Sequence, residues 1–282
     1  MALQPYASSL EKTWYYTFRV FCGLVFFFLI VPILVIIPLS FNSEPYFTYP
    51  MPGFSLRWYN SIFGDDPQAI LWQRAIWNSV VIGVSATMLA TTLGTLAALG
   101  LTRANFTGKR VMMAILISPI VVPVVITAVG MFYFYAQIGL ASTLTGLVLA
   151  HTALGVPFVV ITVTATLIGF DNNLVRAGAV LGADPVRVFF KVTLPLILPG
   201  VVSGALFAFV TSWDEIVVAL FLASPEQHTI PRRMWSGISE LISPTITAAA
   251  TMLIALSIVL MFIMEMLRRR GERLRGITHR QE

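Results

Sequence analysis

Two adjacent carboxylates, Asp214 and Glu215, lie well inside a long apolar stretch of this 282-residue chain. A carboxylate at membrane depth is costly unless it is hydrated, paired or protonated. In a water-filled cavity these groups would attract a cationic solute, with Trp213 and Trp235 as aromatic walls for the cation. Neighbouring helix positions point about 100° apart, so we expect only one carboxylate to face such a path.

A structural interpretation of the same four residues remains open. The carboxylates could instead bond to polar groups of neighbouring helices, and the tryptophans could anchor the chain at the membrane interface. We therefore keep Trp213, Asp214, Glu215 and Trp235 as candidate residues of a solute path, beside this alternative.

The sequence offers no catalytic constellation. Its three histidines, His151, His228 and His279, are scattered, and Cys22 is the single cysteine, so we expect neither a catalytic nor a metal site. The pair Gly108-Lys109 lacks the upstream glycine and the following Ser or Thr of a phosphate-binding loop. We therefore expect no cofactor on this chain and no enzymatic activity of its own.

The composition is that of an integral membrane protein. Only 11% of residues are charged and the mean hydropathy is +0.84, whereas soluble domains carry about 25% charged residues. Six stretches are long enough to cross a bilayer as helices. We place these spans at residues 19–41, 75–101, 111–136, 143–169, 196–222 and 244–267.

The distribution of Lys and Arg predicts the orientation. With the N-terminus inside, fourteen of the eighteen basic residues fall on the inner side, six of them between Arg268 and Arg280. Basic residues are retained on the cytoplasmic side, so both termini are predicted to be cytoplasmic. Residues 1–18 then form a cytoplasmic segment, 19–267 a six-helix domain and 268–282 a cytoplasmic basic tail.

Several spans carry residues that affect helix packing. Small residues in span 75–101, including Gly83 and Gly94, allow close approach of neighbouring helices. Pro119, Pro123 and Pro157 each remove a backbone hydrogen bond. They predict either interrupted helices around a pathway or simple kinks for packing.

The polar segment 170–195 between the fourth and fifth spans predicts two short helices. The first runs from about Leu174 to Leu181 and breaks at Gly182. Asp184 as N-cap and Pro185 at the first helical position then start a second helix, which extends to about Val192. This helix carries apolar residues on one side and Arg187 on the other.

The same segment resembles the EAA loop of ABC importer permeases. The family pattern is Glu-Ala-Ala, three residues, Gly, nine residues, an aliphatic residue, one residue and Leu-Pro. Gly182, Val192 and Leu194-Pro195 keep that spacing, whereas positions 176–178 read Arg-Ala-Gly. Shorter words resemble the spermidine/putrescine subgroup. These are SFNS at 40–43, SLRWY at 55–59, SWDEI at 212–216, TIP at 229–231 and ISP at 242–244.

The resemblance implies an all-α type I importer permease of a bacterial inner membrane. Such a subunit transports a solute and catalyses no reaction of its own. Implied partners are two ATPase copies that hold ATP and Mg, a second similar permease and an external solute-binding protein. The implied cargo is a small organic solute, namely a polyamine such as putrescine or spermidine. The residues implied in ATPase coupling are Arg176, Ala177, Gly178, Gly182, Ala183, Asp184, Arg187, Phe189, Phe190, Leu194 and Pro195.

Other functions stay open at this point. A permease for an amino acid derivative, an opine or a phosphonate would share the same words. A self-contained secondary transporter would need intramembrane coupling groups and often an internal repeat. The sequence shows one carboxylate pair and no evident repeat, which disfavours that class.

Overall fold

The structure, a computed structural model, describes residue 6 and residues 8–240 and 243–274. The regular structure of the described residues is helical, apart from an isolated bridge between Asn42 and Phe54, and loops join the helices. In chain order they are α1 (Ser9–Leu39), α2 (Arg57–Phe63), α3 (Pro67–Arg103), α4 (Lys109–Val121), α5 (Val124–Gln137), α6 (Leu144–Ile168), α7 (Asn173–Val180), α8 (Pro185–Val188), the π turn η1 (Phe189–Thr193), α9 (Leu194–Asp214), α10 (Val217–Leu222), the 3-10 turn η2 (Pro225–Gln227), α11 (Ile230–Glu240) and α12 (Pro244–Leu274).

Five helices are long and apolar enough to cross a membrane: α1, α3, α6, α12 and the run from α8 to α9. Four of them, α1, α3, α6 and α12, confirm predicted spans, and the run from α8 to α9 covers most of a fifth. The remaining span, 111–136, is not one straight helix, because α4 and α5 meet at an angle of 106°. The break falls at Pro123, whereas Pro119 and Pro157 stay inside α4 and α6.

The fifth predicted span also differs from the expectation. Residues 196–222 do not form one helix, since α9 ends at Asp214 and α10 begins only at Val217. The predicted basic tail, 268–282, lies largely outside the description. Its backbone continues α12 to Leu274, and residues 275–282 are outside the described residues.

The core is formed by α3, α6 and α9, which pack through small residues. A Cβ added to Gly155 of α6 would lie 3.0 Å from Ala208 Cβ of α9 and 3.1 Å from Ala90 Cβ of α3. Gly94 of α3 approaches the Val159 side chain of α6 in the same way. In lipid, close packing rather than hydrophobicity drives helix association, so these contacts confirm the predicted role of the small residues.

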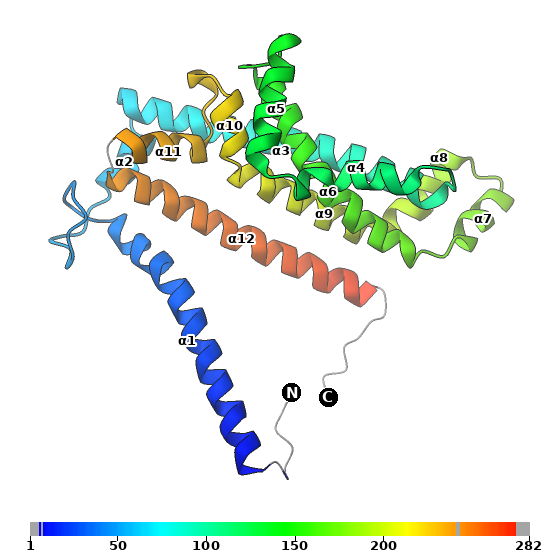
Figure 1. The fold of residues 1–282 in the computed structure, drawn as a ribbon, viewed down its shortest axis with the longest axis horizontal. Coiled ribbons are helices and arrows are strands. Elements are labelled where there is room, and N and C mark those ends of the chain that lie inside the picture. The colour runs from blue at the N-terminus through cyan, green and yellow to red at the C-terminus, as the bar shows by residue number, and fades with distance from the viewer. Residues whose placement is uncertain (1–5, 7, 241–242, 275–282) are drawn as a thin grey trace.

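The peripheral helices are arranged around this core (Figure 1). The short helices α7 and α8 lie at one end of the bundle, and α2 and α11 lie at the opposite end. Helix α1 diverges from the bundle, and none of its residues is buried. The bundle therefore has two distinct ends, joined by α3, α6, α9 and α12.

Candidate functional site

The turn between α7 and α8 is built around Gly182. Its φ of +79° lies in the left-handed region that favours glycine. The Gly182 N–H donates to Ala179 O at 3.0 Å, and the Ala183 N–H donates to Gly178 O at 3.1 Å. This pair of bonds is the Schellman arrangement, which satisfies the last carbonyls of a helix. The predicted helix break is confirmed at the predicted residue.

The start of α8 is fixed by Asp184. Its carboxylate accepts a hydrogen bond of 2.9 Å from the Arg187 N–H, and Pro185 occupies the first helical position. The same carboxylate lies 3.9 Å from Arg187 Nε, and both side chains are exposed. An exposed pair of this kind contributes about 0.2–1 kcal/mol. The predicted N-cap is thus present.

The connection from α8 to α9 is continuous. We expected the second short helix to run to Val192 before a separate span, but α8 passes through η1 directly into α9. In η1 the Leu194 N–H bonds to Phe189 O, five residues earlier. Pro195 has no N–H and clashes with the preceding turn of an α-helix. The wider π turn accommodates Pro195, so the helix continues from η1 into α9.

Helices α7 and α8 pack on each other where Gly178 meets Val188. A Cβ at Gly178 would lie 3.1 Å from Val188 Cγ2, and Val188 is buried. The EAA pattern has alanine at the position of Gly178. Glycine instead of alanine at position 178 therefore leaves room for the Val188 side chain. This tight packing is a structural reason for the departure from the EAA pattern.

An exposed apolar surface surrounds the turn, and the sequence interpretation missed part of it. Val180 and Leu181 are each 86% exposed, and Val186 is 64% exposed. Phe190 is also exposed, whereas Phe189 is half-buried. The signal was the pair of apolar residues directly before Gly182 in an otherwise polar segment. Such exposed apolar residues mark a contact with a protein or with a membrane.

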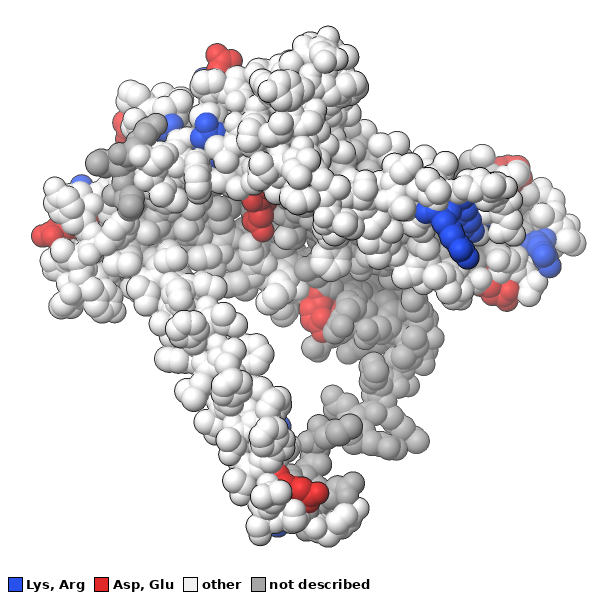
Figure 2. Space-filling model, in the orientation of Figure 1, with Lys and Arg blue, Asp and Glu red and all other residues white. Residues whose placement is uncertain are grey.

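The other predicted coupling residues lie along the same segment. Arg176 and Ala177 are exposed on α7, and Ala183 is half-buried in the turn. Leu194 is half-buried and Pro195 exposed at the start of α9. The eleven residues are thus gathered at one end of the molecule. Figure 2 shows Lys and Arg side chains grouped over that end.

The two carboxylates are separated by the end of a helix. Asp214 is the last residue of α9, and its side chain is exposed. Glu215 instead accepts a hydrogen bond of 2.9 Å from the Val218 N–H at the start of α10. We expected the two side chains to point about 100° apart because they are neighbours on one helix. That reason does not apply, because α9 ends between them. Asp214 is left as the more accessible carboxylate.

The two tryptophans do not come together at one site. Trp213 is buried in an apolar cluster with Trp58, Ile62 and Trp72, and it stacks on Phe209 with ring centroids 5.5 Å apart. It lines an apolar cavity of about 230 Å³. Trp235 lies on α11 with 51% of its surface exposed. The two rings therefore lie in different surroundings, one buried and one exposed.

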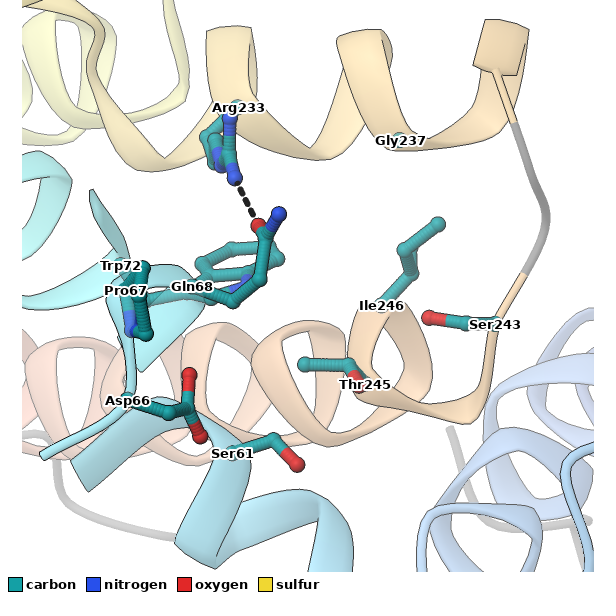
Figure 3. A pocket seen from close by; sticks show the side chains of 10 residues that line it. All are labelled: Ser61, Asp66, Pro67, Gln68, Trp72, Arg233, Gly237, Ser243, Thr245 and Ile246. Atoms are coloured by element: carbon teal, nitrogen blue, oxygen red, sulfur yellow. Dashed lines mark hydrogen bonds between the residues drawn. The ribbon is translucent and has the colours of Figure 1, made fainter. Parts of the chain in front are cut away.

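A larger, polar cleft of about 720 Å³ opens at the opposite end from α7. Figure 3 shows Arg233 of α11 facing Gln68 of α3, and their side chains form a hydrogen bond of 2.6 Å. The Arg233 guanidinium also lies 5.8 Å from the Trp72 ring. Asp66 and Ser61 border the same cleft. Nearby His228 has a lowered pKa because of burial and the positive charges of Arg232 and Arg233.

Among the residues that the structure describes, no three His, Cys, Asp or Glu side chains gather as a metal site. His151 is instead buried in the core, where its Nδ1 lies 2.8 Å from Ser212 Oγ. It therefore joins α6 to α9.

Comparison with known proteins relates the chain to transport components. Residues 90–273 match the family model described as "Binding-protein-dependent transport system inner membrane component". The chain is 34% identical over 251 residues to the spermidine/putrescine transport system permease protein PotC of Haemophilus influenzae, covering 89% of this chain and 96% of that protein. It is 32% identical over 257 residues to the putrescine transport system permease protein PotI of Escherichia coli, covering 89% and 90%.

The fold has a solved counterpart. A chain from the crystal structure of a bacterial ABC transporter for import of the polysaccharide alginate superposes with a TM-score of 0.77. The match covers 93% of this chain and 99% of that chain at 16% identity. At this identity the likeness establishes the fold alone, which is that of an ABC importer permease.

Proposed function

This chain belongs to the family of binding-protein-dependent transport inner membrane components, and on that premise we propose that it forms the membrane path of an ATP-driven polyamine importer. The proposal that the cargo is a polyamine rests on the 30–34% identity to PotC and PotI permeases over most of the chain. Their names specify spermidine and putrescine, which are flexible organic cations at neutral pH. A cationic cargo also fits Asp214, an exposed carboxylate at the end of an apolar helix.

The proposed orientation places α7 and α8 in the cytoplasm, with both chain termini on that side. The basic residues near this end support it, because Lys and Arg are retained on the cytoplasmic side. The polar cleft with Arg233 and Gln68 then faces outward. An external solute-binding protein would deliver the cargo to that side.

In the proposed mechanism the chemistry of ATP takes place in two partner ATPase subunits, which hold ATP and Mg. The exposed apolar residues around Gly182 would be inserted into an ATPase surface. Because α8 continues through η1 into α9, a displacement of α8 is transmitted directly to a core helix. Rigid movement of this kind opens a cavity alternately to the two sides.

A second, similar permease would complete the path. Helix α1 has no buried residue, and the broken pair α4–α5 leaves apolar side chains such as Ile126 and Tyr133 exposed. Lipid covers part of this surface, and a second permease would cover the rest. The alternative cargo is another small organic solute, such as an amino acid derivative, an opine or a phosphonate.

Reconstitution tests the proposed function. The chain is placed in liposomes with its candidate ATPase, second permease and binding protein, and uptake of radiolabelled putrescine and spermidine is measured with and without internal ATP. We expect uptake only with ATP and with the ATPase present. Uptake by this chain alone would indicate a secondary transporter, and ATP-driven uptake of a different solute without polyamine uptake would rule out the cargo.

A further inference from the structure

A cavity of about 330 Å³ lies where the end of α3, the end of α6 and the first turn of α7 meet. Arg103 of α3 and Arg176 of α7 both line it. These arginines are distant in sequence and belong to separate helices. The tertiary fold brings their side chains to one cavity.

The cavity has an excess of positive charge. Its lining contains two arginines and no carboxylate. Arg103 Nη2 donates to Thr193 Oγ1 at 3.2 Å, so one of its N–H groups is already bound to a neutral partner. Two guanidinium groups at one cavity repel each other, so an anion between them would be stabilised.

The departure from the EAA pattern at Arg176 creates this excess. The pattern has glutamate at that position, and a carboxylate there would share the cavity with the Arg103 guanidinium. Arg176 adds a second positive charge instead. The substitution therefore changes a site suited to an internal acid–base pair into one suited to an external anion.

The lining and place of the cavity favour a phosphate group. Guanidinium groups form paired hydrogen bonds that match phosphate oxygens. Leu167 and Phe170 form an apolar wall beside the two charges. The cavity lies at the ends of two helices that are long and apolar enough to cross a membrane, α3 and α6. On the proposed function, these helix ends would lie near the lipid headgroups.

We propose that this cavity binds a phosphate group, supplied by an anionic lipid headgroup or by phosphate in solution. Basic pockets between spanning helices on the cytoplasmic side are suited to anionic headgroups. The side of the membrane in this proposal rests on the proposed function. The charge and the lining of the cavity do not depend on it.

Phosphate binding would link three parts of the molecule. Arg176 is on α7, and Arg103 is on α3 and also bonds to Thr193 in η1. Thr193 is fully buried. A phosphate held by both arginines would thus fix the segment from α7 to η1 at both of its ends. Phosphate binding would therefore affect how firmly α7 is held against the bundle.

Native mass spectrometry of the purified full-length chain tests the proposal without ATP, ATPase or solute. The chain is titrated with phosphatidylglycerol and, separately, with phosphatidylcholine. We expect tighter binding of phosphatidylglycerol, weakened about fivefold by Arg176→Gln or Arg103→Gln. Arg176→Glu should weaken it further. That variant is decisive because it restores the residue of the EAA pattern at an exposed position.

Arg110→Glu is the matched control, since Arg110 is an exposed arginine near the same end of the bundle that does not line the cavity. It should leave phosphatidylglycerol affinity unchanged. Competition by inorganic phosphate identifies the source. Displacement of the lipid at an equal concentration supports phosphate in solution, and retention of the lipid supports the headgroup.

Unchanged phosphatidylglycerol affinity in Arg176→Glu, together with no effect of inorganic phosphate on melting temperature, would overturn the proposal. If that variant instead loses only ATPase co-purification, Arg176 pairs with an acidic residue of the ATPase and the phosphate site is wrong. Because binding is measured on the chain alone, failure of polyamine transport leaves this result unaffected.

Discussion

His151 Nδ1 of α6 and Ser212 Oγ of α9 lie 2.8 Å apart in the buried core of the bundle. His151 is 1% exposed and Ser212 is 5% exposed. Their contact joins two of the three core helices two residues before Asp214. The polar pair therefore fixes the end of α9 that carries Asp214, the carboxylate proposed to attract the solute.

We predict that this contact stabilises the fold modestly. Ser212→Ala should lower the free energy of unfolding by about 0.6–2 kcal/mol, because hydrogen bonds between membrane helices contribute in this range. Thermal melting in detergent of Ser212→Ala, His151→Ala and the double variant measures the coupling. Strictly additive losses would show that the two side chains do not interact.

Gly155 should not tolerate a larger residue. Gly155→Ala places a methyl group 3.0 Å from Ala208 Cβ, and overpacking of this kind costs about 1–3 kcal/mol. Gly100→Ala is the matched control, because no atom lies within 4 Å of a Cβ there. Melting temperatures should fall for the first variant and stay level or rise for the second. Equal behaviour would contradict the packing of the core.

The turn at Gly182 should be required for coupling. Gly182→Ala forces an L-residue to a φ of +79°, at a cost of about 1–2 kcal/mol, and the relaxed turn would displace α8. ATP-driven uptake should fall while the amount of chain in the membrane is unchanged. Gly169→Ala, at a φ of −89° and in open space, should retain uptake.

Asp214 and Glu215 should differ in their contributions. Asp214→Asn removes an exposed negative charge and should raise the KM for a polyamine, most strongly at low ionic strength. Glu215→Gln keeps an oxygen that can accept the hydrogen bond from Val218, so it should retain near-normal uptake. Initial uptake rates against polyamine concentration measure both. An unchanged KM in Asp214→Asn would exclude its part in attracting the cargo.

His228 should make stability pH-dependent. Burial and the charges of Arg232 and Arg233 lower its pKa below the ordinary 6.5, so the unfolded chain binds the proton more readily than the folded one. Its contribution is complete above pH 6.5 and is lost as the pH falls through the lowered pKa. Melting temperatures from about pH 7.5 to 5 should decline less in His228→Gln. Identical pH profiles would refute this contribution.

Local sequence determined much of the fold. Long apolar stretches marked five helices because a bilayer requires about 20 apolar residues to span it. Gly182 and Asp184 marked the turn between α7 and α8, because a left-handed cap and an N-cap depend on a few neighbouring residues. These features could be predicted because their causes lie within one or two helical turns.

Tertiary packing decided which distant residues meet. The sequence suggested Trp213 as a wall of the solute path, but packing against Trp58 and Trp72 buried it in an apolar cluster. It gave Arg176 as a departure from the EAA pattern and a candidate coupling residue, whereas the fold placed it with Arg103 at one cavity. Hydropathy fixes how deep a helix lies, but its rotation and neighbours follow from side-chain packing across the whole bundle.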